Sequence, residues 1–261
     1  MIIIDELQQF LYYEVMPVYK INSDSRDTQA GWQQSAIAEI GVKIGQSDYE
    51  GNKFACMLDW AVSRFDTLTL TLSDTLYRHN YEAEGHSKDV AMNMAKTYGD
   101  FWLARNKPTI REFGQKADII VQRWDEWTAH PEFDDLLKNL QTLYRQDERF
   151  YTAARADIEG FLNRYGDKIT PSNKFLYYRK FYDHLLEQLA VYILIGREIG
   201  SAQLYPGPDL QSFGHLRQIG TPNNLKGLEN SPYVRLSFHR NYSLLPISED
   251  DDRDVASGFV L

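Results

Sequence analysis

The sequence predicts a three-layer α/β domain built on a parallel sheet, and three observations carry this prediction. Residues 67–73, TLTLTLS, alternate β-branched and leucine side chains, which is typical of a strand. Residues 51–65 place apolar side chains at helical spacing, and a strand-like apolar run precedes them at 36–44. Strand, helix and strand therefore follow one another, and this order favours parallel pairing through a crossover helix.

The next elements continue the same alternation. Residues 87–105 have the periodicity of a long helix, which we expect to end near Lys107 and Pro108. The run ADIIV at 117–121 then predicts a third strand.

The second half of the chain is mainly helical in pattern. Apolar residues recur at helical spacing from about 132 to 195, and Gly166 and Pro171 interrupt the pattern. The run YVRLSF at 233–238 predicts a late strand.

Length and composition favour one soluble domain. The chain has 261 residues with 43% apolar and 25% charged side chains, and we expect a single domain over 1–245. Residues 246–261 contain a block of acidic side chains and predict a flexible tail. No run of about 18 apolar residues is present, which argues against a membrane partner.

The N-terminal residues and the cysteine content point to the cytoplasm. The first residues, MIIIDELQQF, carry acids where a signal peptide needs basic side chains, and Cys56 is the single cysteine. A reducing compartment is therefore expected. Oligomeric state stays open between a monomer and a weak homo-oligomer.

Charge limits the nucleic-acid partners. The net charge of −9 argues against DNA and against broad phosphate-backbone binding. Residues 96–123 reverse this balance locally, with six basic side chains against three acidic ones. A solvated helix face gives the same count, so this stretch is only a candidate interface.

No residue pattern indicates a cofactor or a metal. His79, His86 and His130 have spacings that match no metal-binding motif, and Cys56 has no cysteine partner. The chain also lacks a glycine-rich phosphate loop of either standard spacing.

Polar side chains gather at the predicted strand ends. Lys43, Gln46 and Asp74 each fall at or just after the carboxyl end of a predicted strand. Ligands of open α/β sheets bind outside these ends, so the sequence predicts a site there.

Several blocks of the sequence resemble the tRNA-dependent cyclodipeptide synthases. The resemblance covers roughly residues 35–240 and rests on IGVKIGQSDYEGNKF, LDWAVSRFDTLTLTLSDTLYRHNY, FWLARN, QRWDEWTAHPEF, HLLEQLAVY and LYPGP. It implies a Rossmann-like domain similar to class Ic aminoacyl-tRNA synthetase catalytic domains. It also implies that aminoacyl-tRNA is the partner and that two aminoacyl groups are joined into a cyclic dipeptide.

The resemblance assigns a subgroup and locates the expected catalytic positions. Tyr205-Pro206 resembles the Tyr-Pro subgroup, with Gln46 at its variable position. The family's catalytic serine in Gly-x-Ser is replaced by Lys43. Its tyrosine and glutamate, four residues apart on one helix, align with His184 and Gln188.

These replacements predict an altered mechanism. An acylated lysine would be an amide, which is far less reactive than a serine ester, so Lys43 is expected to stabilise an oxyanion as a cation. His184 is expected to act as general base. The predicted catalytic residues are Lys43, His184, Gln188 and Tyr205, and the predicted substrate-binding residues are Gly41, Gln46, Asp74, Arg78, Glu187 and Pro206. The residues predicted to bind tRNA are Lys96, Arg105, Lys107, Arg111 and Lys116.

Two functions remain open. The first is aminoacyl transfer from aminoacyl-tRNA, without an acyl-serine intermediate, to form an amide or a cyclic dipeptide. The alternative is an inactive homologue that binds aminoacyl-tRNA or another small partner. An engineered substitution at Lys43 would not by itself account for the changes at His184 and Gln188. The sequence does not reveal which amino acid is used.

Overall fold

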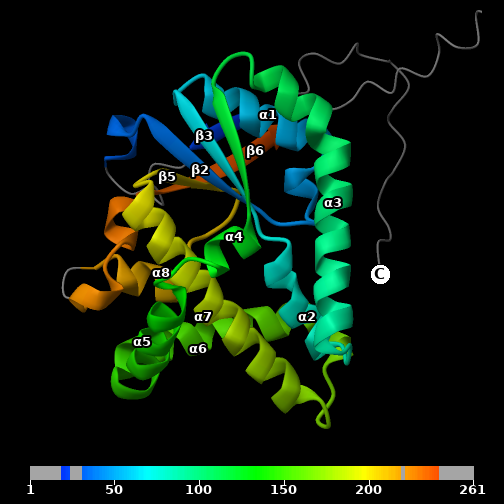
Figure 1. The fold of residues 1–261 in the computed structure, drawn as a ribbon, viewed down its shortest axis with the longest axis vertical. Coiled ribbons are helices and arrows are strands. Elements are labelled where there is room, and N and C mark those ends of the chain that lie inside the picture. The colour runs from blue at the N-terminus through cyan, green and yellow to red at the C-terminus, as the bar shows by residue number, and fades with distance from the viewer. Residues whose placement is uncertain (1–18, 24–30, 219–220, 241–261) are drawn as a thin grey trace, which may run out of the picture.

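A six-stranded sheet forms the centre of the fold (Figure 1). The computed structural model describes residues 19–23, 31–218 and 221–240, so the predicted tail at 246–261 lies outside it. The strand order is β1-β6-β5-β2-β3-β4, and only the β1–β6 pair is antiparallel. This confirms the predicted α/β class with a mainly parallel sheet. The strands are β1 (Tyr19–Ser23), β2 (Ile37–Val42), β3 (Thr67–Leu72), β4 (Asp118–Arg123), β5 (Ala202–Tyr205) and β6 (Tyr233–Arg240).

The strand order reverses between β2 and β5. From β2 the chain proceeds outwards to β3 and β4, and it later returns to place β5 and β6 on the other side of β2. Such a reversal is the topological switch point at which open α/β sheets bind ligands. The carboxyl ends of β2 and β5 therefore mark the expected site.

The two faces of the sheet differ in polarity. Ile40 and Leu70 belong to a fully buried apolar face that packs against α1 (Gly51–Val62) and other apolar side chains. On β2, Glu39 and Gly41 alternate with these positions and point to the opposite face, where Tyr192 packs over Gly41. The buried side chain of Glu39 thus lies on the same face of the sheet as Tyr192.

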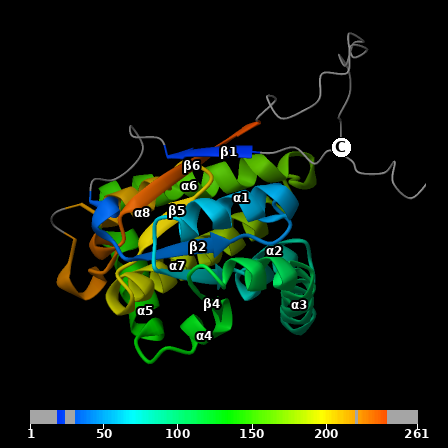
Figure 2. The same ribbon diagram turned by 90° about the horizontal axis from the view of Figure 1, so that it is seen from above.

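The remaining helices except α3 form a second core below the sheet (Figure 1). Trp102 and Phe113 of α3 belong to the first core, with α1, and the view from above in Figure 2 shows α3 at the edge next to α2. In the second core α7 contacts α2, α5 and α6, and it carries an almost continuous run of buried residues. The helices are α2 (Arg78–Ala83), α3 (Lys88–Phe113), α4 (Trp124–Thr128), α5 (Phe133–Gln146), α6 (Glu148–Tyr165), α7 (Lys174–Glu198) and α8 (Gln211–Leu216). No helix within the described ranges is long and apolar enough to cross a membrane.

The predicted end of the long helix at Lys107 and Pro108 is wrong, because α3 continues to Phe113. Proline removes one helical N–H and leaves the carbonyl four residues earlier, that of Ala104, without its usual partner. Both Ala104 and Pro108 are exposed, so water can take the place of the missing donor.

The other predicted elements are present with shifted bounds. The strand predicted at 117–121 runs from Asp118 to Arg123, and the helix predicted at 51–65 ends at Val62. The helical stretch after 132 is broken at Gly166 and before Lys174, as predicted. Strands β1 and β5 were not predicted.

Candidate active site

A hydrogen bond joins the two strand ends at the switch point. Lys43 follows β2 directly, and Tyr205 is the last residue of β5. The Nζ atom of Lys43 donates to the hydroxyl of Tyr205 at 2.5 Å. The structure therefore brings together two predicted catalytic residues from distant parts of the sequence and holds the ammonium group in place.

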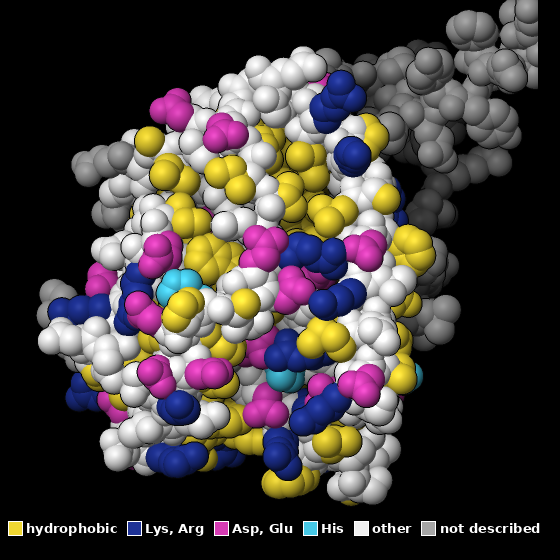
Figure 3. Space-filling view, in the orientation of Figure 1, with side chains coloured by type: hydrophobic (Ala, Val, Ile, Leu, Met, Phe, Trp, Pro, Cys, Tyr) yellow, Lys and Arg dark blue, Asp and Glu magenta, His cyan; other side chains and the backbone are white. Residues whose placement is uncertain are grey.

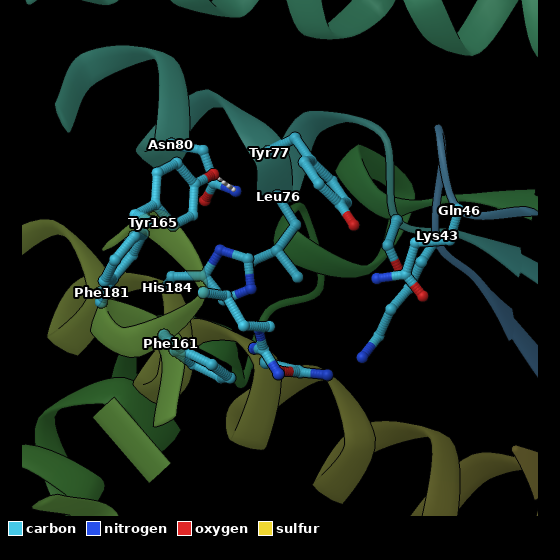
Figure 4. A pocket seen from close by; sticks show the side chains of 12 residues that line it. Lys43, Gln46, Leu76, Tyr77, Asn80, Phe161, Tyr165, Phe181 and His184 are labelled. Carbon is cyan, nitrogen blue, oxygen red and sulfur yellow. Dashed lines mark hydrogen bonds between the residues drawn. The ribbon is translucent and has the colours of Figure 1, made fainter. Parts of the chain in front are cut away.

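A cavity of about 180 Å³ lies beside Lys43. Figure 4 shows Lys43, Gln46 and Tyr77 on one side of it and His184 on the other. Gln46 is thus at the cavity, where the sequence placed a substrate contact. The lining residues are Lys43, Gln46, Ser73, Leu76, Tyr77, Asn80, Phe161, Arg164, Tyr165, Phe181, His184 and Gln188.

Helix α7 brings His184 and Gln188 to the wall of this cavity. The spacing of four residues places both side chains on one face of the helix. Burial lowers the pKa of His184 well below its usual 6.5, and the charges of His79 and Lys43 act in the same direction. The imidazole is therefore neutral at pH 7, and its Nδ1 atom has no hydrogen-bond partner.

Glu187 points away from the cavity, into a buried polar cluster. It accepts hydrogen bonds from Arg78 (2.7 Å to Oε1), His79 (2.9 Å) and the indole of Trp124 (2.9 Å). Burial alone would raise the pKa of Glu187, but the hydrogen bonds from His79 and Arg78 outweigh it and lower this pKa to about 2. Glu187 and Arg78 therefore satisfy each other, and neither lines the cavity.

Asp74 is also paired inside the protein. Its carboxylate accepts from the Nε atom of Arg123 at 2.8 Å and from the backbone N–H of Thr75 at 2.8 Å. Asp74 is fully buried and does not line the cavity. Its neighbour Ser73, at the end of β3, does line it.

Gly41 provides space for Tyr192 beneath the strand ends. A Cβ atom at Gly41 would lie 2.0 Å from the Tyr192 hydroxyl, so a larger residue does not fit without movement. Next to it, burial raises the pKa of Glu39 to about 8, although the hydroxyls of Thr71 and Tyr192 lower it in part. Neither carboxyl oxygen of Glu39 has a hydrogen-bond partner of good geometry.

A smaller cavity of about 30 Å³, enough for one water molecule, adjoins the first. Lys43 and Gln188 border both cavities, and Tyr205 borders the smaller one. Pro206 follows β5 and borders neither of the two.

Sequence comparison decides the family. Residues 19–179, more than half of the chain, match the family profile described as cyclodipeptide synthase. The chain belongs to the cyclodipeptide synthase family. No curated protein is detectably similar to it in sequence.

Solved cyclodipeptide synthase structures share the fold. A cyclodipeptide synthase from Fluoribacter dumoffii matches with a TM-score of 0.75 at 21% identity, covering 86% of this chain and all of that one. A Mycobacterium tuberculosis protein matches with a TM-score of 0.66 at 19% identity, covering 84% of this chain and 93% of that one. Its structure is described as demonstrating that cyclodipeptide synthetases are related to type I tRNA synthetases.

A third solved structure is a complex with charged tRNA. The cyclodipeptide synthase from Candidatus Glomeribacter gigasporarum is bound to Phe-tRNAPhe, and it matches with a TM-score of 0.57 at 19% identity. The match covers 84% of this chain and 92% of the Glomeribacter protein. The family profile confirms the predicted family, and these structures confirm the predicted Rossmann-like fold.

The basic residues predicted to contact tRNA do not border the cavity of this cyclodipeptide synthase family member. Lys96, Arg105 and Lys116 form ion pairs with Asp125, Glu50 and Asp59, respectively. Lys107 and Arg111 instead line a separate groove on α3. In Figure 3 basic and acidic side chains alternate over the visible face, so no large basic surface is present there.

Sequence reasoning missed most of the other residues that line the cavity. Tyr77 and Asn80 lie within the SDTLYRHN block, and their signal was their place just after a strand end. Phe161, Arg164 and Tyr165 come from α6, where their helical spacing indicated only packing. No group of three or more His, Cys, Asp or Glu side chains in the described part of the chain could hold a metal ion.

Proposed function

We propose that this protein transfers an aminoacyl group from aminoacyl-tRNA to an amine, forming an amide or a cyclic dipeptide without an acyl-serine intermediate. The observation that carries the proposal is the arrangement of Lys43 at the switch point with His184 and Gln188 across one cavity. Family membership supports an aminoacyltransferase, and the tRNA complex of a related fold supports charged tRNA as the partner. The reaction would then take place in the cytoplasm.

In the proposed step, the amine attacks the ester carbonyl of the aminoacyl-tRNA. A C–N bond forms, and the bond from the carbonyl carbon to the ribose oxygen breaks. The neutral imidazole of His184 accepts the proton that the amine loses and passes it to the leaving ribose oxygen. The ammonium group of Lys43 stabilises the oxyanion that develops on the carbonyl.

The positions of three residues support these roles. Tyr205 holds the Lys43 ammonium group through its hydroxyl, which limits the movement of the charge. His184 lines the cavity and its imidazole is neutral, so the ring can accept a proton. The amide of Gln188, on the same helix face as His184, replaces a charged group and can bind the substrate amine by hydrogen bonding.

We propose Lys107 and Arg111 as tRNA-binding residues, because they line an open groove on α3. The subgroup of Tyr205-Pro206 and the substrate roles of Gln46, Gly41 and Pro206 belong to the same proposal. The proposed effect of Asp74, Arg78 and Glu187 on the substrate is indirect, because their ion pairs support the walls of the cavity.

The test is to incubate the protein with a full set of charged tRNAs and to follow both small products and intact protein mass by mass spectrometry. A new amide or cyclic product with unmodified protein is expected. An aminoacyl adduct on Lys43, or on the cavity hydroxyl of Ser73, would refute the mechanism. Ser73→Ala, which removes that hydroxyl, should leave product formation intact.

One observation favours an inactive, tRNA-binding homologue as the second candidate. A general base is normally oriented by a third group, and Nδ1 of His184 has no such partner. Binding of charged tRNA without any product would support this second function.

A further inference from the structure

Four of the twelve residues that line the 180 Å³ cavity are phenylalanine or tyrosine. Phe161, Phe181, Tyr77 and Tyr165 all line it, and Leu76 adds a further apolar side chain. In Figure 4 the rings of Tyr165, Phe181 and Phe161 lie along one side, close to His184. At about 30 Å³ for each water molecule, the cavity has the volume of about six waters, which is room for a ring-bearing side chain.

The charges in this cavity exclude a cationic side chain. Lys43 and Arg164 line it, and no acidic residue is among the described side chains of its wall. His184 is neutral. A lysyl or arginyl side chain would therefore meet two positive charges and no negative one.

Besides Nδ1 of His184, one further buried polar atom of the wall lacks a hydrogen-bond partner. The Nδ2 atom of Asn80 donates to the hydroxyl of Tyr165 at 2.8 Å, and Oδ1 does not take part in this bond. Oδ1 is buried and accepts no hydrogen bond. Buried acceptors are normally satisfied, so this oxygen indicates a donor that a ligand supplies. A carboxylate cannot donate, and neither can a hydrocarbon side chain.

We propose that Asn80 determines substrate specificity and that the cavity takes an aromatic aminoacyl side chain bearing a hydrogen-bond donor, the phenol of tyrosine or the indole of tryptophan. This inference rests on the proposed aminoacyl transfer. The aromatic walls pack against the ring, and Asn80 Oδ1 accepts its O–H or N–H. Phenylalanine fills the same walls but leaves Oδ1 unpaired.

The experiment compares tRNA charged with tyrosine, tryptophan, phenylalanine, leucine or lysine. Two quantities are measured for each: kcat/KM for product formation, and the Kd obtained from protection of the aminoacyl ester against hydrolysis. Tyrosine or tryptophan should exceed phenylalanine by about tenfold to a hundredfold in at least one of these quantities, since an unpaired buried acceptor weakens binding by that order. The amino acid that gives the stronger preference, tyrosine or tryptophan, identifies the donor as the phenol or the indole.

The variant Asn80→Leu removes the acceptor and should abolish this preference, mainly by weakening use of the polar ring while phenylalanine is used as before or better. Asn80→Asp keeps an acceptor and should retain the preference. Asn163→Leu, an exposed change on α6, is the matched control and should change neither quantity. Thermal unfolding of each variant shows whether the fold is retained.

Failure of the inference and failure of the proposed function are distinguishable. Product formed equally well from phenylalanine and tyrosine would overturn the role of Asn80 and leave aminoacyl transfer intact. Product formation absent with every tRNA would overturn the transfer reaction, while the Kd ratio would still decide whether Asn80 selects a donor. An equal loss for tyrosine and phenylalanine in Asn80→Leu would reduce Asn80 to a structural role.

Discussion

Replacing Glu187 by glutamine should destabilise the protein in a pH-dependent way. In the folded protein the pKa of Glu187 is lowered from its ordinary 4.5 to about 2, so the folded state favours the ionised carboxylate. The difference, at about 1.36 kcal/mol per pH unit, corresponds to a stabilisation of about 3 kcal/mol at pH 7. Breaking a buried ion pair by removing one partner costs about 3–5 kcal/mol, which agrees with this value.

The stabilisation is fully present above pH 4.5 and is lost as the pH falls towards 2, because a lowered folded-state pKa favours the ionised form. Urea unfolding of the parent and of Glu187→Gln at pH 7 and at pH 3 measures it. The free energy of unfolding should differ by about 3 kcal/mol at pH 7 and by only about 1 kcal/mol at pH 3. An equal difference at both pH values would refute the assigned ionisation, and no difference at pH 7 would refute the ion pair with Arg78 as a source of stability.

Glu39→Gln should show the opposite pH response: burial raises the pKa of Glu39 to about 8, so its contribution is present below pH 4.5 and lost as the pH rises through 8. The variant should be more stable than the parent by about 4 kcal/mol at pH 8 and by less than about 1 kcal/mol at pH 5, in urea unfolding. Lys43→Met should lower kcat about 10²–10³-fold with little change in the Kd of charged tRNA, and an unchanged kcat would contradict the oxyanion role. His184→Ala should lower kcat about 10²–10⁴-fold. In the parent, kcat should stay flat from pH 7 to pH 6, because the pKa of His184 lies well below 6.5, and an acid limb centred at 6.5 would contradict this. Reversing the charges of Lys107 and Arg111 should weaken tRNA binding and reduce its salt dependence, as filter binding at several salt concentrations would show.

The local patterns were sufficient for the elements that bury a regular apolar face. The run TLTLTLS forms β3, and the segment with helical apolar spacing after Gly51 forms α1. Both elements bury one regular apolar face in the same core, so their periodic pattern was visible in the sequence. Strand β5 has only four residues, and its pairing with β2 joins segments more than 160 residues apart. Such a strand is specified by tertiary contacts and carries little periodic signal of its own.

The residues of the site likewise fall into those that the sequence could predict and those that it could not. Lys43 and Gln46 could be placed from a strand end, His184 and Gln188 could be placed from the family resemblance, and all four line the cavity. Glu187 could not, because a neighbour in sequence on a helix points about 100° away, here towards the cluster of Arg78 and Trp124. The aromatic residues of α6 reach the cavity only through the packing of α6 against α7, which no local pattern reveals.

The contact between Lys43 and Tyr205 has a consequence for biosynthesis of the chain. A ribosome completes β2, β3 and β4 long before it adds β5, so the half of the sheet that carries Lys43 is made without its partner. Until Tyr205 has emerged and β5 has docked, the ammonium group has no anchor and one wall of the smaller cavity is missing. A nascent or prematurely terminated chain that ends before β5 therefore lacks both the hydrogen bond that holds Lys43 and a complete smaller cavity.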